Sequence, residues 1–122
     1  MAETSRTFRE FLRAARQWAI GAEHKALALG MGHAQLRNAE KAAAAGAEVV
    51  LPSAANLRLA CLIDIAEALR SRRSTRAEQT VWLKAPNVDF GGQTPLERII
   101  EQDVAGLFYV RRYLQGTEDL RR

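Results

Sequence analysis

The chain has 122 residues, 48% of them hydrophobic and 26% charged, an ordinary globular composition that suffices for one compact domain or two small interlocked halves. The single cysteine, Cys61, excludes an internal disulfide, and no window approaches the about 18 uninterrupted apolar residues of a membrane-spanning helix, so we expect a cytoplasmic protein. The formal net charge of +4 favours an acidic partner or a nucleic acid, but the excess is modest and spread along the chain, which fits a solvated surface equally well.

The first predicted helix lies close to the N-terminus. Its apolar residues recur at intervals of three and four, which places them on one stripe of a helix: Phe8, Phe11, Leu12, Ala15 and Trp18. Four arginines fall mostly off that stripe: Arg6, Arg9, Arg13 and Arg16. The pattern Thr7-x-x-Glu10 predicts a capped start, and Gly21 predicts the end. We therefore expect an amphipathic helix that starts near Thr7.

Two shorter helices are predicted next, over residues 22–29 and 33–45. The turn Leu29-Gly30-Met31-Gly32 separates them, and Gly46 closes the second. Two short helices joined by such a turn form the helix-turn-helix pattern. Arginine and asparagine can contact base edges in the major groove, so the candidate DNA-binding residues are those predicted for the exposed face of the second helix: Gln35, Arg37, Asn38 and Lys41. The alternative is a solvated polar face on an alanine-rich helix.

A long central helix is predicted over residues 53–71. An aliphatic run, residues 47–51, precedes it and ends at Pro52, and we expect this run to be one extended stretch that packs the two halves together. Ser53 is a suitable N-cap. The apolar stripe of this helix contains Leu59, Leu62, Ile63, Ala66 and Leu69, and Cys61 is expected to pack beside it as a small hydrophobe.

The segment from Thr75 to Glu97 carries the strongest local signals. Two capping boxes, Thr75-x-x-Glu78 and Thr94-x-x-Glu97, each predict the start of a helix, and Pro95 suits the first helical position. Pro86 ends the first of these helices, and Gly91-Gly92 permits the positive φ angles of a compact turn.

A last helix is predicted from about residue 104 to near Gly116. Gly106 inside it indicates close approach of another backbone, because glycine there costs about 1 kcal/mol relative to alanine. The remaining faces of this helix are crowded by Tyr109, Arg111, Arg112 and Tyr113. Exposed tyrosine and arginine are the composition of protein-interface anchors. The alternative is one tyrosine over the core and solvated arginines. The tail, residues 117–122, is polar and is expected to be mobile on its own.

The residues Trp82-Leu83-x-x-Pro86-Asn87 and Gly91-Gly92-x-Thr94-Pro95-Leu96-Glu97, followed by Gly106, Val110 and Leu114, resemble the toxin-binding domain of the Xre/MbcA/ParS antitoxin family. The resemblance covers roughly residues 53–117. Members usually carry an Xre-type helix-turn-helix unit ahead of this domain, so the resemblance implies an all-α fold. Residues 1–50 would form the helix-turn-helix region, able to read DNA or kept only as scaffold, and residues 51–122 the toxin-binding domain. The motif residues with an implied structural role are Trp82, Pro86, Asn87, Gly91, Gly92, Thr94 and Pro95.

The resemblance also implies a function. The chain would be the antitoxin of a type II pair that neutralises a RES-domain, NAD⁺-degrading toxin by blocking its active-site cleft, with homodimerisation in the complex and autoregulation of its operon as further expectations. The expected toxin-binding residues are Tyr109, Arg111, Arg112, Tyr113, Glu118 and Asp119. One alternative is a DNA-binding regulator whose C-terminal part only oligomerises. A weaker alternative is an interaction module for a different partner.

The sequence carries little that points to catalysis. His24 and His33 have no metal-ligand spacing with any cysteine, and Cys61 lies in an apolar stripe where a thiolate is disfavoured. Gly91-Gly92 lacks the preceding strand and the lysine of a phosphate-binding loop. We therefore expect a binding protein without catalytic residues, metal or cofactor.

Overall fold

The computed structural model describes the backbone of residues 2–72 and 75–120 and the side chains of residues 3–72 and 75–116. Over these residues the chain is helical and contains no strand, which confirms the all-α prediction. The elements are α1 (Ala2–Gln17), α2 (Ala22–Leu29), α3 (His33–Ala44), α4 (Ser53–Ser71), α5 (Arg76–Lys84), the 3-10 helix η1 (Val88–Phe90), α6 (Pro95–Ile99) and α7 (Val104–Leu120).

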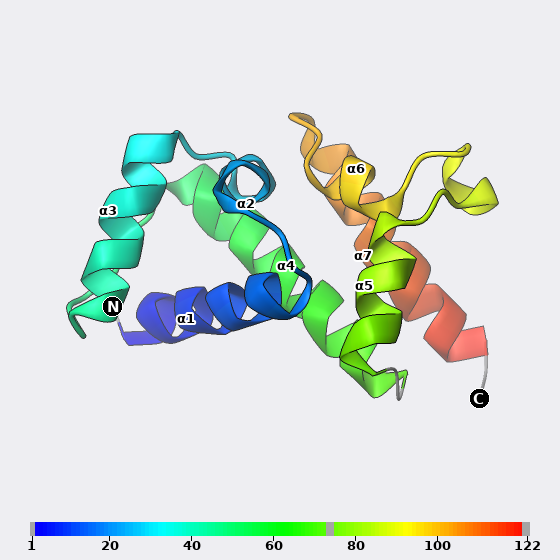
Figure 1. The fold of residues 1–122 in the computed structure, drawn as a ribbon, viewed down its shortest axis with the longest axis horizontal. Helices are drawn as coiled ribbons and strands as arrows, with labels where there is room; N and C mark the ends of the chain where they lie inside the picture. Colours follow the sequence, from blue (N-terminus) through cyan, green and yellow to red (C-terminus); the bar gives the residue numbers. More distant parts are fainter. Residues whose placement is uncertain (1, 73–74, 121–122) are drawn as a thin grey trace.

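Helix α4 is the element that both halves of the chain share. It runs through the middle of the molecule, with α1, α2 and α3 on one side and α5, α6 and α7 on the other (Figure 1). It contacts α1 and α2 from the N-terminal half and α7 from the C-terminal half. The predicted central helix is therefore confirmed, and it joins the two halves through side-chain packing.

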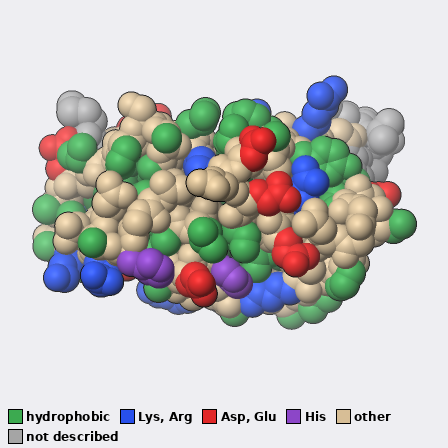
Figure 2. Space-filling view, turned by 90° about the horizontal axis from the view of Figure 1, so that it is seen from above, with side chains coloured by type: hydrophobic (Ala, Val, Ile, Leu, Met, Phe, Trp, Pro, Cys, Tyr) green, Lys and Arg blue, Asp and Glu red, His purple; other side chains and the backbone are tan. Residues whose placement is uncertain are grey.

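The core is one cluster of buried residues that extends through all the α-helices and η1. Most residues of the predicted stripes are inside it. Phe8 and Phe11 of α1, Trp18 directly after α1, and Leu59, Leu62 and Leu69 of α4 are at most 2% exposed, whereas Leu12 and Ile63 are partly buried. On the outer face seen in Figure 2, basic and acidic side chains are interspersed with hydrophobic ones. No helix among the described residues is long and apolar enough to cross a bilayer.

The aliphatic run before α4 is extended, as predicted, and packs into the core. Val49 and Leu51 are buried while Val50 is 79% exposed, the alternation expected of an extended segment. The backbone N–H of Val49 donates to the Ser5 hydroxyl at 2.9 Å, which ties this segment to the start of α1.

Three predicted helix ends were wrong. Helix α1 starts at Ala2 instead of near Thr7, and the Thr7 hydroxyl donates to the Glu3 carbonyl one turn earlier, at 2.6 Å, so it does not cap the helix. The helix already ends at Gln17, and Gly21 is the N-cap of α2. Helix α7 continues past Gly116 to Leu120, because a glycine weakens a helix without ending it when its φ stays negative.

Ser53 is likewise the first residue of α4, with Pro52 in the N-cap position, so its predicted capping role is not realised. The paired helices α2 and α3 agree closely with prediction: the second ends at Ala44, one residue earlier than expected, and Gly30 and Gly46 adopt φ angles of +66° and +72° after the two helices.

Candidate functional site

Helices α5 and α6 each begin at one of the predicted capping boxes. The Thr75 hydroxyl accepts from the Glu78 N–H at 3.1 Å, and the Glu78 carboxylate accepts from the Thr75 N–H at 2.7 Å. Thr94 and Glu97 repeat the arrangement at 3.0 and 2.7 Å. The hydrogen bond from the Thr75 backbone lowers the pKa of Glu78. Both boxes are confirmed.

The turn between these helices is organised by Asn87. Its side-chain oxygen accepts from the Asp89 N–H at 2.9 Å, its backbone N–H donates to the Gln93 carbonyl, and its own carbonyl accepts from Gly92. Gly91 and Gly92 adopt φ angles of +67° and +88°, which explains why two glycines follow η1. Helix α5 ends two residues before Pro86, as predicted.

An aromatic cluster fastens this turn to α7. The ring of Phe90, which is 3% exposed, lies 5.3 Å from Tyr109, 5.1 Å from Tyr113 and 6.0 Å from Trp82, each in edge-on geometry. Trp82 and Tyr113 also stack at 6.3 Å. Each such ring pair stabilises the fold by about 0.5–1.5 kcal/mol beyond the area it buries. The residues Trp82, Phe90, Tyr109 and Tyr113 are called the aromatic cluster below.

Both tyrosine hydroxyls donate to the same residue. Tyr109 donates to the backbone carbonyl of Asp89, and Tyr113 donates to its carboxylate, each at 2.8 Å. The hydrogen bond to Asp89, together with burial, raises the pKa of Tyr113. The two tyrosines therefore hold η1 against α7, while the ring of Tyr109 stays 41% exposed.

The two predicted arginines of α7 differ. Arg111 lies over the Phe108 ring at 5.2 Å and places its guanidinium 3.5 Å from the Asp64 carboxylate, so it links α7 to α4. Arg112 is exposed and has no hydrogen bond or ion pair within the described part of the chain. The backbones of Glu118 and Asp119 belong to α7, but their side chains lie outside the described residues.

Three further residues exposed on α5 and η1 or packed on Tyr109 were not predicted. Val88 of η1 is 89% exposed and Val81 of α5 is 66% exposed. The Arg98 guanidinium lies 5.1 Å from the centre of the Tyr109 ring. A signal existed for Val88 alone, because it falls between Asn87 and Gly91 in a turn, and turns run over the surface.

Helix α7 crosses the end of α6 at Gly106. A Cβ atom at this position would overlap the Arg98 carbonyl oxygen and the Glu101 carboxylate. The predicted close approach of another backbone is confirmed.

The buried Arg58 of α4 joins the C-terminal ends of α2 and α6. It is 5% exposed and donates to the Ala28 carbonyl at 2.7 Å, to that of Ile99 at 2.8 Å and to that of Glu101 at 3.0 Å. Burial lowers the pKa of Arg58. Sequence reasoning missed this role, although Arg58 precedes Leu62 and Ile65 at helical spacing and so falls on the apolar stripe.

The predicted DNA-binding residues are all exposed on α3. The Gln35 side chain accepts from the Gly32 N–H at 3.0 Å, so it takes part in capping the helix. Arg37, Asn38 and Lys41 have no hydrogen bond or ion pair within residues 3–72 and 75–116.

Reactive groups are sparse in the described part of the chain. Its residues contain no group of three or more His, Cys, Asp and Glu side chains placed to hold a metal ion. Cys61 is fully buried, and burial raises the pKa of its thiol, so the thiol stays protonated and shielded at neutral pH.

A comparison with known protein families finds a match in the C-terminal half of the chain. Residues 68–119 match the family model of the antitoxin Xre/MbcA/ParS C-terminal toxin-binding domain. No curated protein and no solved structure matches the chain. The matched segment begins at residue 68, later than the predicted 53, and it contains the aromatic cluster, η1 and the crossing at Gly106. Residues 68–119 of this chain are therefore similar to the toxin-binding domain of the Xre/MbcA/ParS antitoxin family.

Proposed function

We propose that the chain is the antitoxin of a type II toxin–antitoxin pair and that it neutralises a RES-domain, NAD⁺-degrading toxin by covering its active-site cleft. The toxin-binding domain supports the general role. The resemblance of the motif residues to the family supports the toxin class. Homodimerisation in the complex and repression of the operon belong to the same proposal.

The observation that carries the proposal is the outer side of η1 and α7. Val88, Tyr109 and Arg112 are exposed there, and the aromatic cluster holds the first two in place through Asp89 and Phe90. A surface that is already ordered loses little conformational entropy on binding. Tyrosine and arginine are the side chains most enriched among residues that dominate binding energy.

The contact residues that we propose are Tyr109, Arg112 and Tyr113, with Arg111 supporting α7 from below. Glu118 and Asp119 of the tail would reach basic groups in the toxin, because a pocket that binds a phosphate-bearing dinucleotide is itself basic. Trp82, Pro86 and Thr94 would set the angles between helices without touching the toxin.

Co-expression with the toxin encoded beside the antitoxin tests the proposal. Val88→Asp places a charge on the proposed contact surface, and we expect it to abolish protection of the cells. Val50→Asp is the matched control, since it changes a comparably exposed valine in the other half of the molecule. The thermal unfolding of both variants is measured to confirm that they fold.

Full protection by Val88→Asp would remove this surface from the mechanism. The toxin class is tested separately by measuring cellular NAD⁺ when the toxin is expressed alone. Unchanged NAD⁺ with arrested growth would exclude a RES-type activity while leaving the antitoxin role in place. Deleting residues 117–122 tests the tail in the same assay, and undiminished protection would exclude a contribution from Glu118 and Asp119.

A second proposed function is regulation of transcription through α2 and α3. The supporting observation is that Arg37, Asn38 and Lys41 share an exposed helix face and have no partner within the described residues. Such side chains are free to contact base edges. Antitoxin activity and DNA binding use different halves of the chain, so one does not exclude the other.

A further inference from the structure

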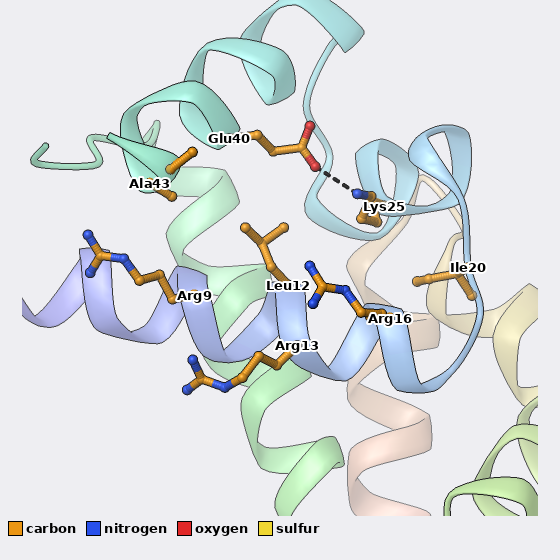
Figure 3. A pocket seen from close by; sticks show the side chains of 9 residues that line it. Arg9, Leu12, Arg13, Arg16, Ile20, Lys25, Glu40 and Ala43 are labelled. Atoms are coloured by element: carbon orange, nitrogen blue, oxygen red, sulfur yellow. Dashed lines mark hydrogen bonds and ion pairs between the residues drawn. The ribbon is translucent and has the colours of Figure 1, made fainter. Parts of the chain in front are cut away.

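A cleft of about 520 Å³ lies between α1, α2 and α3. Three arginines of α1 line it, Arg9, Arg13 and Arg16, together with Lys25 of α2 and Glu40 of α3. In Figure 3 the side chains of Arg9 and Arg16 extend on either side of Leu12, on the side of α1 that faces α3 and Lys25, whereas the Arg13 side chain extends away from α3 at the edge of the cleft. This surface is called the arginine cleft below.

The arginine cleft concentrates the positive charge of the protein. Four basic side chains and one carboxylate line it, a surplus of three positive charges, whereas the whole chain has a formal net charge of +4. Glu40 is already paired with Lys25 at 2.7 Å. The three arginines have no hydrogen bond or ion pair within residues 3–72 and 75–116. Their charge is therefore uncompensated by the described part of the protein.

Three like charges on one helix repel each other and do not stabilise the fold. An anion in the cleft would relieve that repulsion. A helix rises about 1.5 Å per residue, so Arg9 and Arg16 are separated by about 10 Å along α1, which is too long for one phosphate group. Phosphates of one B-DNA strand follow each other at intervals of about 3.4 Å along the duplex axis and lie further apart along the strand itself, so a surface about 10 Å long can meet more than one phosphate group.

We propose that the arginine cleft binds consecutive phosphate groups of one strand of duplex DNA. Guanidinium groups suit this ligand because their planar donors bind phosphate oxygens in pairs. The cleft includes Glu40 and Ala44 of α3, and Arg37 and Lys41 lie further round the same helix, so a strand in the cleft runs alongside the proposed base-reading face. The inference deepens the second proposed function by naming residues that position DNA without reading its sequence.

The test is fluorescence anisotropy of the full chain with labelled duplexes, one of the operon's promoter and one of random sequence, between about 50 and 200 mM salt. The cleft variant is R13Q/R16Q, and the control is R70Q/R76Q, which removes two exposed arginines outside the cleft. We expect R13Q/R16Q to weaken binding to both duplexes at least tenfold and to lower the slope of log K against log salt by about two. The control R70Q/R76Q should change neither the affinity nor the salt slope by a comparable amount.

Lysine at both positions, R13K/R16K, keeps the charge and should retain the wild-type salt slope. Three results would overturn the inference. The first is equal affinity and slope for R13Q/R16Q and the control. The second is absence of salt-dependent DNA binding by the wild type. The third combines two observations: neither heparin nor tripolyphosphate displaces DNA from the wild type, and R13Q/R16Q no longer neutralises the toxin. Together they would show that the cleft binds an acidic protein surface instead of DNA.

The base-reading proposal is tested by a separate variant, R37A/N38A/K41A. If this variant keeps the wild-type preference for promoter over random DNA, the base-reading proposal fails and the cleft inference stands. If R13Q/R16Q binds both duplexes like the wild type while R37A/N38A/K41A loses promoter preference, the cleft inference fails and DNA regulation stands. Neutralisation of the toxin by R13Q/R16Q in co-expression shows that the variant is folded and that antitoxin activity is independent of the cleft.

Discussion

Among single residues, Gly106 has the least freedom to change. It lies where α7 passes the end of α6, and the space that a methyl group would need is filled by the Arg98 carbonyl and the Glu101 carboxylate. Gly116, ten positions later on the same helix, has no atom of the described residues within 4 Å of the position of a Cβ. The two glycines are therefore a matched pair that separates a packing requirement from helix propensity.

We expect Gly106→Ala to lower the free energy of unfolding by about 1–3 kcal/mol, because overpacking outweighs the ~1 kcal/mol that alanine gains in a helix. Gly116→Ala should raise it by up to about 1 kcal/mol. Guanidinium denaturation of both variants measures the difference. A similar increase in the free energy of unfolding of both variants would show that α7 and α6 are not in tight contact at Gly106.

The sequence predicted those hydrogen bonds whose two partners lie within a few residues of each other along the chain. The capping boxes at Thr75 and Thr94 each close within three residues, so their pattern is complete in the sequence. The hydrogen bonds of Tyr109 and Tyr113 reach back 20 and 24 residues to Asp89, and no local pattern indicates such a partner. The sequence could therefore indicate that tyrosine and arginine side chains crowd the surface of the last helix, but it could not indicate that the two tyrosines bind η1.

Among the helices, α4 organises the others through Arg58. The last carbonyls of a helix carry partial negative charge, and Arg58 donates to carbonyls at or next to the ends of both α2 and α6. One buried side chain thus holds a helix of the N-terminal half and a helix of the segment that matches the toxin-binding domain on the same face of α4.

Replacing Arg58 by methionine should lower the free energy of unfolding by about 2–4 kcal/mol, because three carbonyls lose a charged donor inside the protein. Lysine should recover only part of the loss, since an ammonium cannot reach in the two directions that the guanidinium spans. Arg70→Ala on the exposed side of α4 is the control, with a change within about 0.5 kcal/mol. Chemical denaturation measures all three, and a loss from Arg58→Met no larger than the control's would contradict this role.

The sequence predicted the existence and order of the α-helices that the structure describes, because most have their own apolar periodicity or cap and glycines bound α2. Helix ends were less certain. Thr7 and Glu10 match a capping box in letters, yet the chain before them is itself helical, and nothing local distinguishes a cap from a mid-helix threonine. Arg58 could not be assigned from periodicity, since its partners lie about 30 and 40 residues away.

In the whole molecule, one core runs through both halves, and the two proposed binding surfaces lie on opposite sides of α4. The aromatic cluster is built on η1, α5 and α7, and the arginine cleft is built on α1, α2 and α3. The arginines were visible in the sequence as residues off the apolar stripe of α1. Their gathering into a cleft was not, because Lys25 and Glu40 come from other helices. The division into residues 1–50 and 51–122 stays a prediction.

The central claim is that the toxin binds the side of the molecule formed by η1 and α7. Hydrogen exchange of the chain, alone and in complex with the toxin encoded beside it, tests this claim most directly. Our account predicts that amides of residues 88–90 and 104–116 become protected in the complex while those of α3 do not. Protection confined to α1, α2 and α3, with η1 and α7 exchanging as in the free chain, would contradict it.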